Sequence, residues 1–136
     1  MTKDSCSCLI LLAEDHAMVR LWVRKLIESN PGWQVVKEVS DGLELLQYLA
    51  ECECAPHLVI LDISMPRMSG LEALPQIKAM YPHIKVLVLT MHKSQEYFER
   101  AMSAGANGYL LKQHADTALP MAITTIMKGG TYISPL

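Results

Sequence analysis

The chain has 136 residues, of which 51% are hydrophobic and 19% are charged, and its formal net charge is −2. This length fits a single domain that buries about two-thirds of its unfolded surface, and no apolar run approaches the roughly 20 residues that cross a bilayer. The pI of about 6.2 and the lack of a basic cluster argue against direct nucleic-acid binding. No secretory signal is visible, so a cytoplasmic location is expected.

Short apolar runs alternate with amphipathic stretches along the chain. Residues 9–13 form a first apolar run, which predicts a buried strand, and the residues after His16 follow a helical spacing. A second strand is expected over Trp33–Val39, followed by a helix that Ser40 and Asp41 cap. These two strand–helix units set the pattern for the remainder of the chain.

Three more strands and three more helices are expected in the second part of the chain. The strands are predicted at residues 58–61, 85–89 and 109–111. The helices are predicted to begin at Ser69, Ser94 and Asp116. Ser69 with Glu72 three residues later has the spacing of a capping box. Five strands that alternate with five helices predict an α/β fold, a doubly wound five-stranded parallel sheet with right-handed crossovers.

Polar residues occupy the positions where four of these strands end. They are Glu14 with Asp15, Asp62, Thr90 and Lys112. Taken alone, each residue has an ordinary structural role that would explain it: capping a turn, hydrogen-bonding to the backbone or carrying a solvated charge. In a parallel sheet, however, the carboxyl ends share one edge, so a single crevice should hold three carboxylates, a hydroxyl and an ammonium group.

Three carboxylates in one crevice repel one another, so they must take up protons or gather cations. Oxygen ligands with room for water suit Mg²⁺ (or Mn²⁺), which also binds phosphate oxygens. A carboxylate such as Asp62 beside this ion can attack phosphorus to form an acyl phosphate. Thr90 and Lys112 would then hold the phosphoryl oxygens.

This set of strand-end residues, spread over five βα units, resembles the receiver domain of two-component response regulators. The resemblance covers residues 9–127 and implies a flavodoxin-like sheet with strand order 2-1-3-4-5. It implies that a sensor histidine kinase or a small phosphodonor phosphorylates Asp62 in the presence of Mg²⁺, giving an aspartyl phosphate. Thr90 and Lys112 correspond to the residues that bind the phosphoryl oxygens in this family.

The resemblance also assigns roles to the other site residues. Asp15 would ligate the metal directly, Glu14 largely through water, and the main-chain carbonyl of Ser64 would add a further ligand. Tyr109 resembles the switch aromatic that rotates inward when Thr90 moves. No other enzymatic activity is implied, because the chemistry is limited to accepting and slowly hydrolysing the domain's own phosphoryl group.

Three short segments resemble those of the NarL/FixJ (LuxR-type) subgroup of these regulators. They are Glu14-Asp15-His16, Met65-Pro66-Arg67-Met68-Ser69-Gly70 and Gly129-Gly130-Thr131-Tyr132-Ile133-Ser134-Pro135. In that subgroup the last segment leads into a helix-turn-helix DNA-binding domain, which implies transcription regulation, contact with DNA only through that domain, and a homodimer on phosphorylation. The expected parts are a tail (1–8), the receiver (9–128) and the start of a linker (129–136) to an output domain missing from this chain. The alternative is a stand-alone single-domain response regulator.

Two residues after the fourth strand depart from the family pattern or border the expected site. Met91 follows Thr90, where the family generally carries a small side chain. A bulky side chain there should narrow the path of water or phosphodonor to Asp62 and slow phosphorylation by small donors, or hydrolysis. His92 is expected to border the site and tune hydrolysis.

The four cysteines form two Cys-x-Cys pairs, Cys6/Cys8 and Cys52/Cys54. Four reduced thiols are the first expectation in a cytoplasmic chain. Because each pair precedes one of two neighbouring strands, the four thiols could instead gather at the sheet edge opposite Asp62. There they could hold Zn²⁺, or pair as disulfides on oxidation.

A second functional class also uses strand-end acids and Mg²⁺, namely the aspartate-nucleophile phosphatases. Such enzymes usually need a second acid two residues after the nucleophile, whereas this chain has Ser64 there. The chain also lacks a cap domain that would enclose a substrate. The sequence therefore fits the phosphatase hypothesis less well than the receiver-domain hypothesis.

Overall fold

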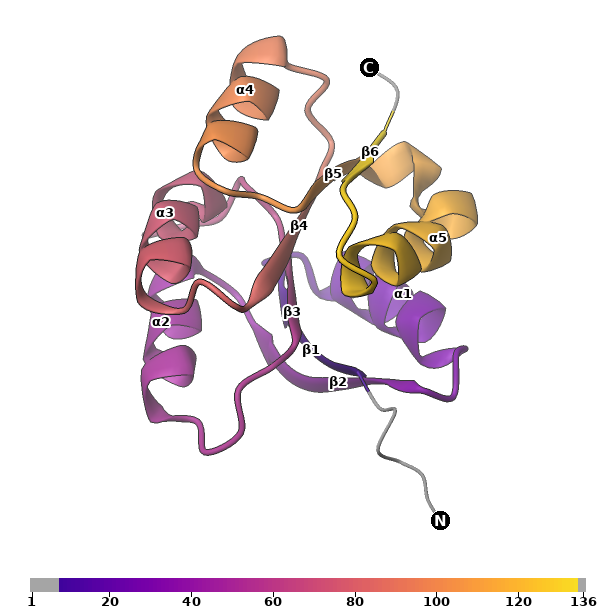
Figure 1. The fold of residues 1–136 in the computed structure, drawn as a ribbon, viewed down its shortest axis with the longest axis horizontal. Helices are drawn as coiled ribbons and strands as arrows, with labels where there is room; N and C mark the ends of the chain where they lie inside the picture. The colour runs from indigo at the N-terminus through magenta and orange to yellow at the C-terminus, as the bar shows by residue number, and fades with distance from the viewer. Residues whose placement is uncertain (1–7, 135–136) are drawn as a thin grey trace.

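The computed structural model describes residues 8–134, and its strands and helices alternate along the chain (Figure 1). The strands are β1 (Cys8–Ala13), β2 (Trp33–Val39), β3 (Leu58–Leu61), β4 (Lys85–Thr90), β5 (Gly108–Leu111) and β6 (Tyr132–Ile133). The helices are α1 (Ala17–Glu28), α2 (Gly42–Glu51), α3 (Gly70–Met80), α4 (Gln95–Ser103) and α5 (Ala115–Met127), with a short 3₁₀ helix, η2 (Lys112–His114), before α5. Within the described range, no helix has the length and apolar character needed to cross a membrane.

The strands form one parallel sheet in the order β2-β1-β3-β4-β5-β6. The predicted doubly wound sheet and the order 2-1-3-4-5 are confirmed, but the predicted number of five strands is wrong. The additional strand, β6, lies in the segment expected to begin a linker and pairs with β5, with Ile133 opposite Tyr109. A strand of two residues is too short to produce a periodic hydrophobic signal, which explains why the sequence did not indicate it.

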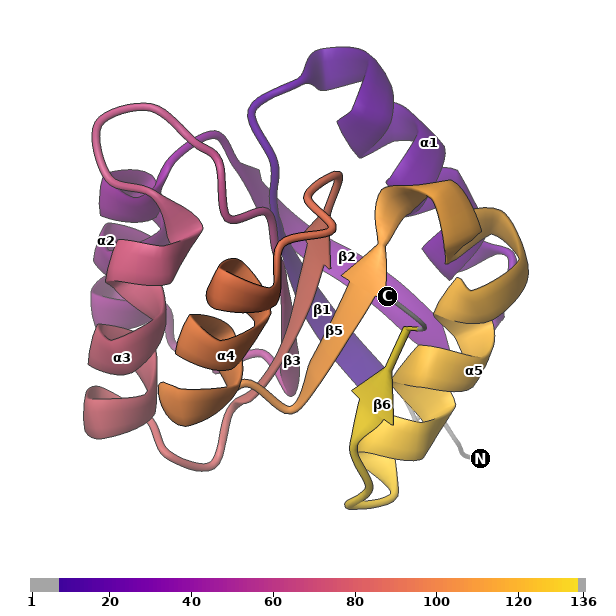
Figure 2. The ribbon, with the colours of Figure 1, turned by 90° about the horizontal axis from the view of Figure 1, so that it is seen from above.

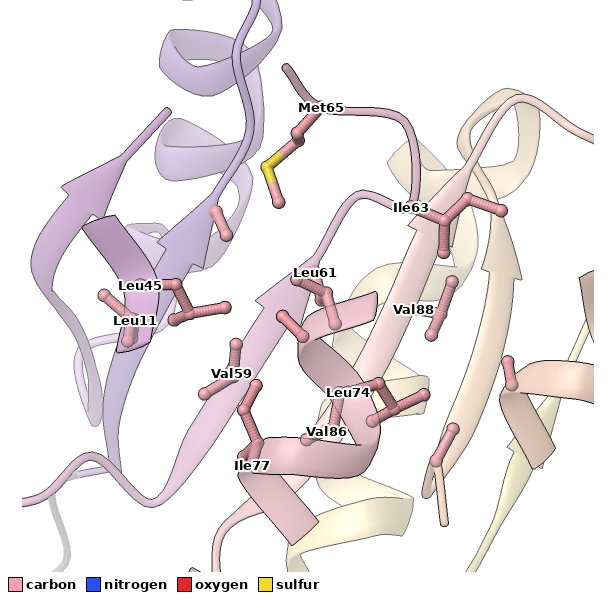
Figure 3. Close-up of a cluster of buried hydrophobic side chains, with 14 of the residues drawn as sticks. Leu11, Leu45, Val59, Leu61, Ile63, Met65, Leu74, Ile77, Val86 and Val88 are labelled. Carbon is pink, nitrogen blue, oxygen red and sulfur yellow. The ribbon is translucent and has the colours of Figure 1, made fainter. Parts of the chain in front are cut away.

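The helices cover both faces of the sheet. Figure 2 shows α2, α3 and α4 on one side and α1 and α5 on the other. On the first side, strand residues such as Leu11, Val59 and Val86 are fully buried against Leu45 of α2 and Ile77 of α3, part of the cluster shown in Figure 3. Because both faces are covered, the interior positions of the central strands are apolar, and polar side chains such as Lys85 and Thr90 of β4 lie at strand ends.

Three of the four helix starts that the sequence assigned to particular capping residues are confirmed. Asp41 accepts a hydrogen bond from the Glu44 amide (2.9 Å), and Ser94 accepts one from the Tyr97 amide (3.2 Å). The capping box at α3 is complete, since Ser69 and Glu72 each accept a hydrogen bond from the other's amide.

The predicted cap of the last helix is wrong. Asp116 lies in the first turn of α5 rather than before it, and His114 holds the capping position without a side-chain cap hydrogen bond. The reason is that η2 leads the chain from β5 directly into α5. In the first turn, the Asp116 carboxylate still interacts favourably with the positive end of the helix dipole.

The core packing predicts a clear contrast between two positions of α3. Ile77 is fully buried, whereas 62% of Met80 is exposed. We expect Ile77→Ala to lower the free energy of unfolding by about 2–5 kcal/mol because it leaves a cavity, and Met80→Ala to change it by less than about 0.5 kcal/mol. Urea unfolding followed by circular dichroism measures both, and equal losses in the two variants would contradict this packing.

Candidate functional site

The ends of β1, β3, β4 and β5 bring the predicted site residues to one edge of the sheet. Ala13 lies opposite Leu61 in the register of β1 and β3, and the Asp62 amide donates to the Ala13 carbonyl (3.0 Å). Thr90 lies opposite Leu111 in the register of β4 and β5. The acids that follow β1 and β3 therefore face the hydroxyl and ammonium groups at the ends of β4 and β5.

Lys112 connects the two buried acids of the site. Its Nζ lies 2.8 Å from Glu14 Oε1 and 3.3 Å from Asp62 Oδ2. Burial alone would lower the pKa of Lys112, but the hydrogen bond to Glu14 and the charges of Asp62 and Glu14 outweigh it and raise that pKa. The ammonium group is therefore charged at neutral pH.

Asp62 is buried, with only 4% of its surface exposed. Its Oδ1 accepts a hydrogen bond from the Ser64 amide (3.2 Å), and its Oδ2 accepts one from Lys112 (3.3 Å). Burial and the neighbouring charge of Glu14 raise the pKa of Asp62 to about 6, and Lys112 offsets only part of this increase. At neutral pH the carboxyl group is mostly ionised, although less completely than an exposed aspartate.

The pKa of Glu14 is shifted in the opposite direction to that of Asp62. Burial would raise its pKa, but hydrogen bonds from Lys112 and the His16 amide (3.0 Å), together with the Lys112 charge and the His16 ring, lower it. The His16 ring nitrogen Nδ1 lies 3.0 Å from Glu14 Oε2 and 3.3 Å from Asp15 Oδ1. His16 is thus a direct neighbour of both acids, although its own side chain is mostly exposed.

The donor set fits a divalent cation. Glu14, Asp15, His16 and Asp62 each offer a ligand atom, and these atoms lie within 4.8 Å of one another. The Oδ1 atom of Asp15 is buried and makes no hydrogen bond of good geometry, although the His16 ring nitrogen lies 3.3 Å away, so this carboxylate oxygen remains available to a cation. Mostly oxygen donors with an unsatisfied carboxylate match the ligand preference of Mg²⁺ or Mn²⁺.

The structure gives no support to a thiolate zinc site among the cysteines that it describes. Cys8, Cys52 and Cys54 are free thiols. Within residues 8–134, the one cluster of side chains close enough to ligate a single metal ion contains none of these cysteines. Burial raises the pKa of Cys8 to about 11, which disfavours the thiolate that a metal would need. Cys6 lies outside the described residues, so the four-thiol arrangement stays a prediction.

A chain of hydrogen bonds leads from the site to Tyr109. The His92 amide donates to Thr90 Oγ1 (3.0 Å), and the His92 ring is hydrogen-bonded to Ser64 Oγ (2.9 Å). The Tyr109 hydroxyl donates to the His92 carbonyl (3.0 Å), and its ring packs edge-to-face against Phe98. Thr90 and Tyr109 are both fully buried, so in this structure Tyr109 points inward.

Met91 lies beside the site rather than inside it. Its side chain is 73% exposed. It lines a largely apolar hollow of about 360 Å³, together with Val19, Trp22, Leu111, Lys112 and Gln113. Lys112 belongs to both the hollow and the site, whereas Asp62 does not line the hollow, so Met91 lies next to the site on the side of Lys112.

The sequence did not indicate an ion pair that lies next to the site. Arg67, in the loop after β3, donates from Nε to Asp41 Oδ2 (2.8 Å) at the start of α2. Arg67 also has a positive φ of 63°, a conformation that arginine rarely adopts. Neither residue carries a sequence signal for the pairing, because Asp41 already had a complete explanation as a helix cap.

The raised pKa of Asp62 predicts how stability depends on pH. The native state holds a proton on Asp62 up to about pH 6, whereas an unfolded aspartate loses it near pH 4, so this group makes stability fall as pH rises through that window. Without divalent cations, Asp62→Asn should raise the free energy of unfolding at pH 7 by roughly 1–3 kcal/mol and change it little near pH 4. Urea unfolding in a chelator across this range measures the difference, and a gain that does not vary with pH would contradict the assignment.

Comparison with known proteins identifies the family. The sequence model of one protein family, the response regulator receiver domain, matches residues 10–124. The oxygen regulatory protein NreC of Staphylococcus carnosus is 37% identical over 127 residues, which make up 93% of this chain and 58% of that protein. The transcriptional regulatory protein DegU of Brevibacillus brevis is 33% identical over 126 residues, 93% of this chain and 52% of that protein. The chain thus spans a little over half the length of these relatives.

Solved structures agree with this match. A LuxR-family two-component response regulator from Aurantimonas sp. SI85-9A1 superposes with a TM-score of 0.88 at 34% identity, covering 95% of this chain and 91% of that one. The non-phosphorylated receiver domain of the stress response regulator RcsB from Escherichia coli gives 0.86 at 29% identity, with 95% and 99% coverage. The chain therefore belongs to the response regulator receiver family and, within it, to the NarL/FixJ (LuxR-type) subgroup.

Proposed function

We propose that this receiver domain is a phosphorylation-controlled switch and that a sensor histidine kinase phosphorylates Asp62. One observation carries the proposal. The Asp62 carboxylate is held between the Lys112 ammonium and the Ser64 amide, and its ligand atom lies within 4.8 Å of those of Glu14 and Asp15. This geometry provides an oriented nucleophile, a fixed positive charge and a place for a cation at a single sheet edge.

The residues divide the phosphoryl transfer among them. An oxygen of the ionised Asp62 forms a bond to phosphorus while the P–N bond of the kinase phosphohistidine breaks and the imidazole leaves. Lys112 stays protonated and compensates charge on the phosphoryl oxygens, and the Thr90 hydroxyl is available to donate to one of them. Glu14, Asp15, Asp62 and the Ser64 main-chain carbonyl would hold Mg²⁺ (or Mn²⁺), which when bound neutralises charge on the carboxylates and the phosphoryl group.

His92 explains how Thr90 and Tyr109 act together. Its amide contacts Thr90 and its carbonyl contacts Tyr109, so a displacement of Thr90 toward a phosphoryl group moves the same short piece of backbone. Tyr109 already points inward, and phosphorylation would then favour this inward position over an outward one. His92 also borders Asp62 through Ser64, which gives it a position from which to tune hydrolysis.

We extend the proposal to the partners and the location of the protein. The homologous DegU is a transcriptional regulatory protein, and one RcsB structure contains two dimers bound to two parallel DNAs. By analogy, this receiver would act in the cytoplasm, dimerise on phosphorylation and control a DNA-binding domain carried C-terminal to it. It would catalyse nothing beyond its own phosphorylation and dephosphorylation. A stand-alone response regulator is the alternative.

Direct phosphorylation tests the function. Incubation with acetyl phosphate or phosphoramidate and Mg²⁺ should add one labile phosphoryl group to the wild type and none to Asp62→Asn, as read by intact mass spectrometry. If a phosphorylated histidine kinase transfers the phosphoryl group and the small donors do not, the proposal stands, and restricted access of small donors to Asp62 explains the difference between the two kinds of donor. The absence of transfer from both kinds of donor would refute it.

Access past Met91 makes a separate prediction. The variant Met91→Ala should accept phosphoryl groups from small donors faster, or lose them by hydrolysis faster, because the side chain borders the approach to Lys112. The time course of the intact mass measures both rates. Met80→Ala, which removes an equally large exposed side chain on α3, is the matched control. Unchanged rates in Met91→Ala would show that this side chain does not limit access.

A further inference from the structure

The loop that follows Asp62 is tied to the start of α2 by a buried carboxylate. The Asp41 side chain is only 5% exposed, and its Oδ1 accepts the Glu44 amide as the helix cap. Its Oδ2 accepts hydrogen bonds from Nε and Nη2 of Arg67. The single carboxylate of Asp41 thus holds both the first turn of α2 and the side chain of a residue in the neighbouring loop.

Arg67 adopts a backbone conformation that is unfavourable for its residue type. Its φ of 63° is positive, and it is the only residue other than glycine with this property within residues 8–134. For an L-residue this conformation costs about 1–2 kcal/mol, whereas glycine adopts it freely. The arginine therefore occupies a position where glycine would be less strained, and the ion pair with Asp41 is what its side chain adds.

Two backbone contacts leave little room for the loop to shift. The Gly42 amide donates to the Met68 carbonyl (2.8 Å), and a Cβ atom at Gly42 would lie 2.7 Å from that oxygen. The Gly70 amide donates to the Ile63 carbonyl (3.2 Å), and a Cβ atom there would lie 2.2 Å from the Asp62 carbonyl oxygen. Residues 63–69 therefore pack directly between the start of α2 and the backbone of Asp62.

This loop carries the Ser64 main chain, whose amide donates to Asp62 Oδ1. We propose that Arg67 is a positioning residue, whose ion pair with Asp41 keeps Ser64 in place beside Asp62 and thereby sets the affinity of the site for divalent cations. The inference rests on the proposed function, because it assumes that the acids and the Ser64 carbonyl hold a metal ion. A shift of this loop would move a ligand of the ion and a hydrogen-bond donor to Asp62 together.

Arg67→Gly separates positioning from stability, because it removes the guanidinium group and relieves the backbone strain at the same time. Asp41→Asn retains a good helix-capping side chain but removes the charge that Arg67 contacts. Manganese affinity, read from the electron paramagnetic resonance signal of free Mn²⁺, reports on the site without requiring phosphorylation. Urea unfolding of each variant shows whether it is folded.

We expect Arg67→Gly and Asp41→Asn to remain folded and to bind Mn²⁺ about 10-fold more weakly than the wild type, the range typical of residues that orient metal ligands. Arg67→Lys should retain part of the affinity, since it keeps the charge but loses the paired donors. Arg24→Ala is the matched control, because it removes an exposed ion pair with Glu38 on the opposite face, and it should bind as the wild type does.

Two results would overturn the inference, and they are distinguishable. If the wild type binds Mn²⁺ and folded Arg67→Gly binds it equally well, Arg67 does not position the site, while the proposed function stands. If the wild type itself binds no Mn²⁺, the metal site of the proposed function fails, and the positioning role fails with it.

Discussion

The contact of one ammonium group with two buried carboxylates controls the chemistry of this domain. Lys112 lies against both Glu14 and Asp62, and a third acid, Asp15, lies close by. Removing carboxylates from water costs several kcal/mol each unless they are paired, and one lysine cannot compensate three acids. The two buried acids are stabilised in their ionised forms to different extents, because the pKa of Glu14 is lowered whereas the pKa of Asp62 is raised. The charge of Asp62 is therefore the less well compensated of the two, and a cation or a phosphoryl group would change the charge balance most at this residue.

The parallel sheet explains why so much of the site could be predicted from sequence. Strands covered on both faces have apolar interiors, so a polar residue where such an apolar run ends is easy to recognise. Asp62, Thr90 and Lys112 each follow this rule, and parallel topology brings strand ends together whatever the helices between them contain. The number of strands was harder to predict, because the pairing of β6 with β5 depends on tertiary contact rather than on a periodic pattern.

The arrangement of the loops was beyond sequence reasoning for a different physical reason. The pairing of Arg67 with Asp41 and the hydrogen bond between Ser64 and His92 join residues that are 26 and 28 positions apart. Each side chain already has an ordinary local explanation, as a cap, a turn residue or an exposed polar group. Only the three-dimensional proximity of loops at the sheet edge gives these side chains a second partner, and a single sequence contains no record of that proximity.

The same backbone segments connect the site with the C-terminal strand. β5 carries Tyr109 and leads directly into Lys112, and the Ser134 amide donates to the Tyr109 carbonyl (2.8 Å). His114, two residues after Lys112, is hydrogen-bonded to the buried Ser134 side chain (2.7 Å). Residues on both sides of Lys112 therefore hold the last described residue of the chain. Because packed elements of this kind move as units rather than deform continuously, a change in the position of Lys112 at Asp62 has a short, contiguous route to the segment that follows α5.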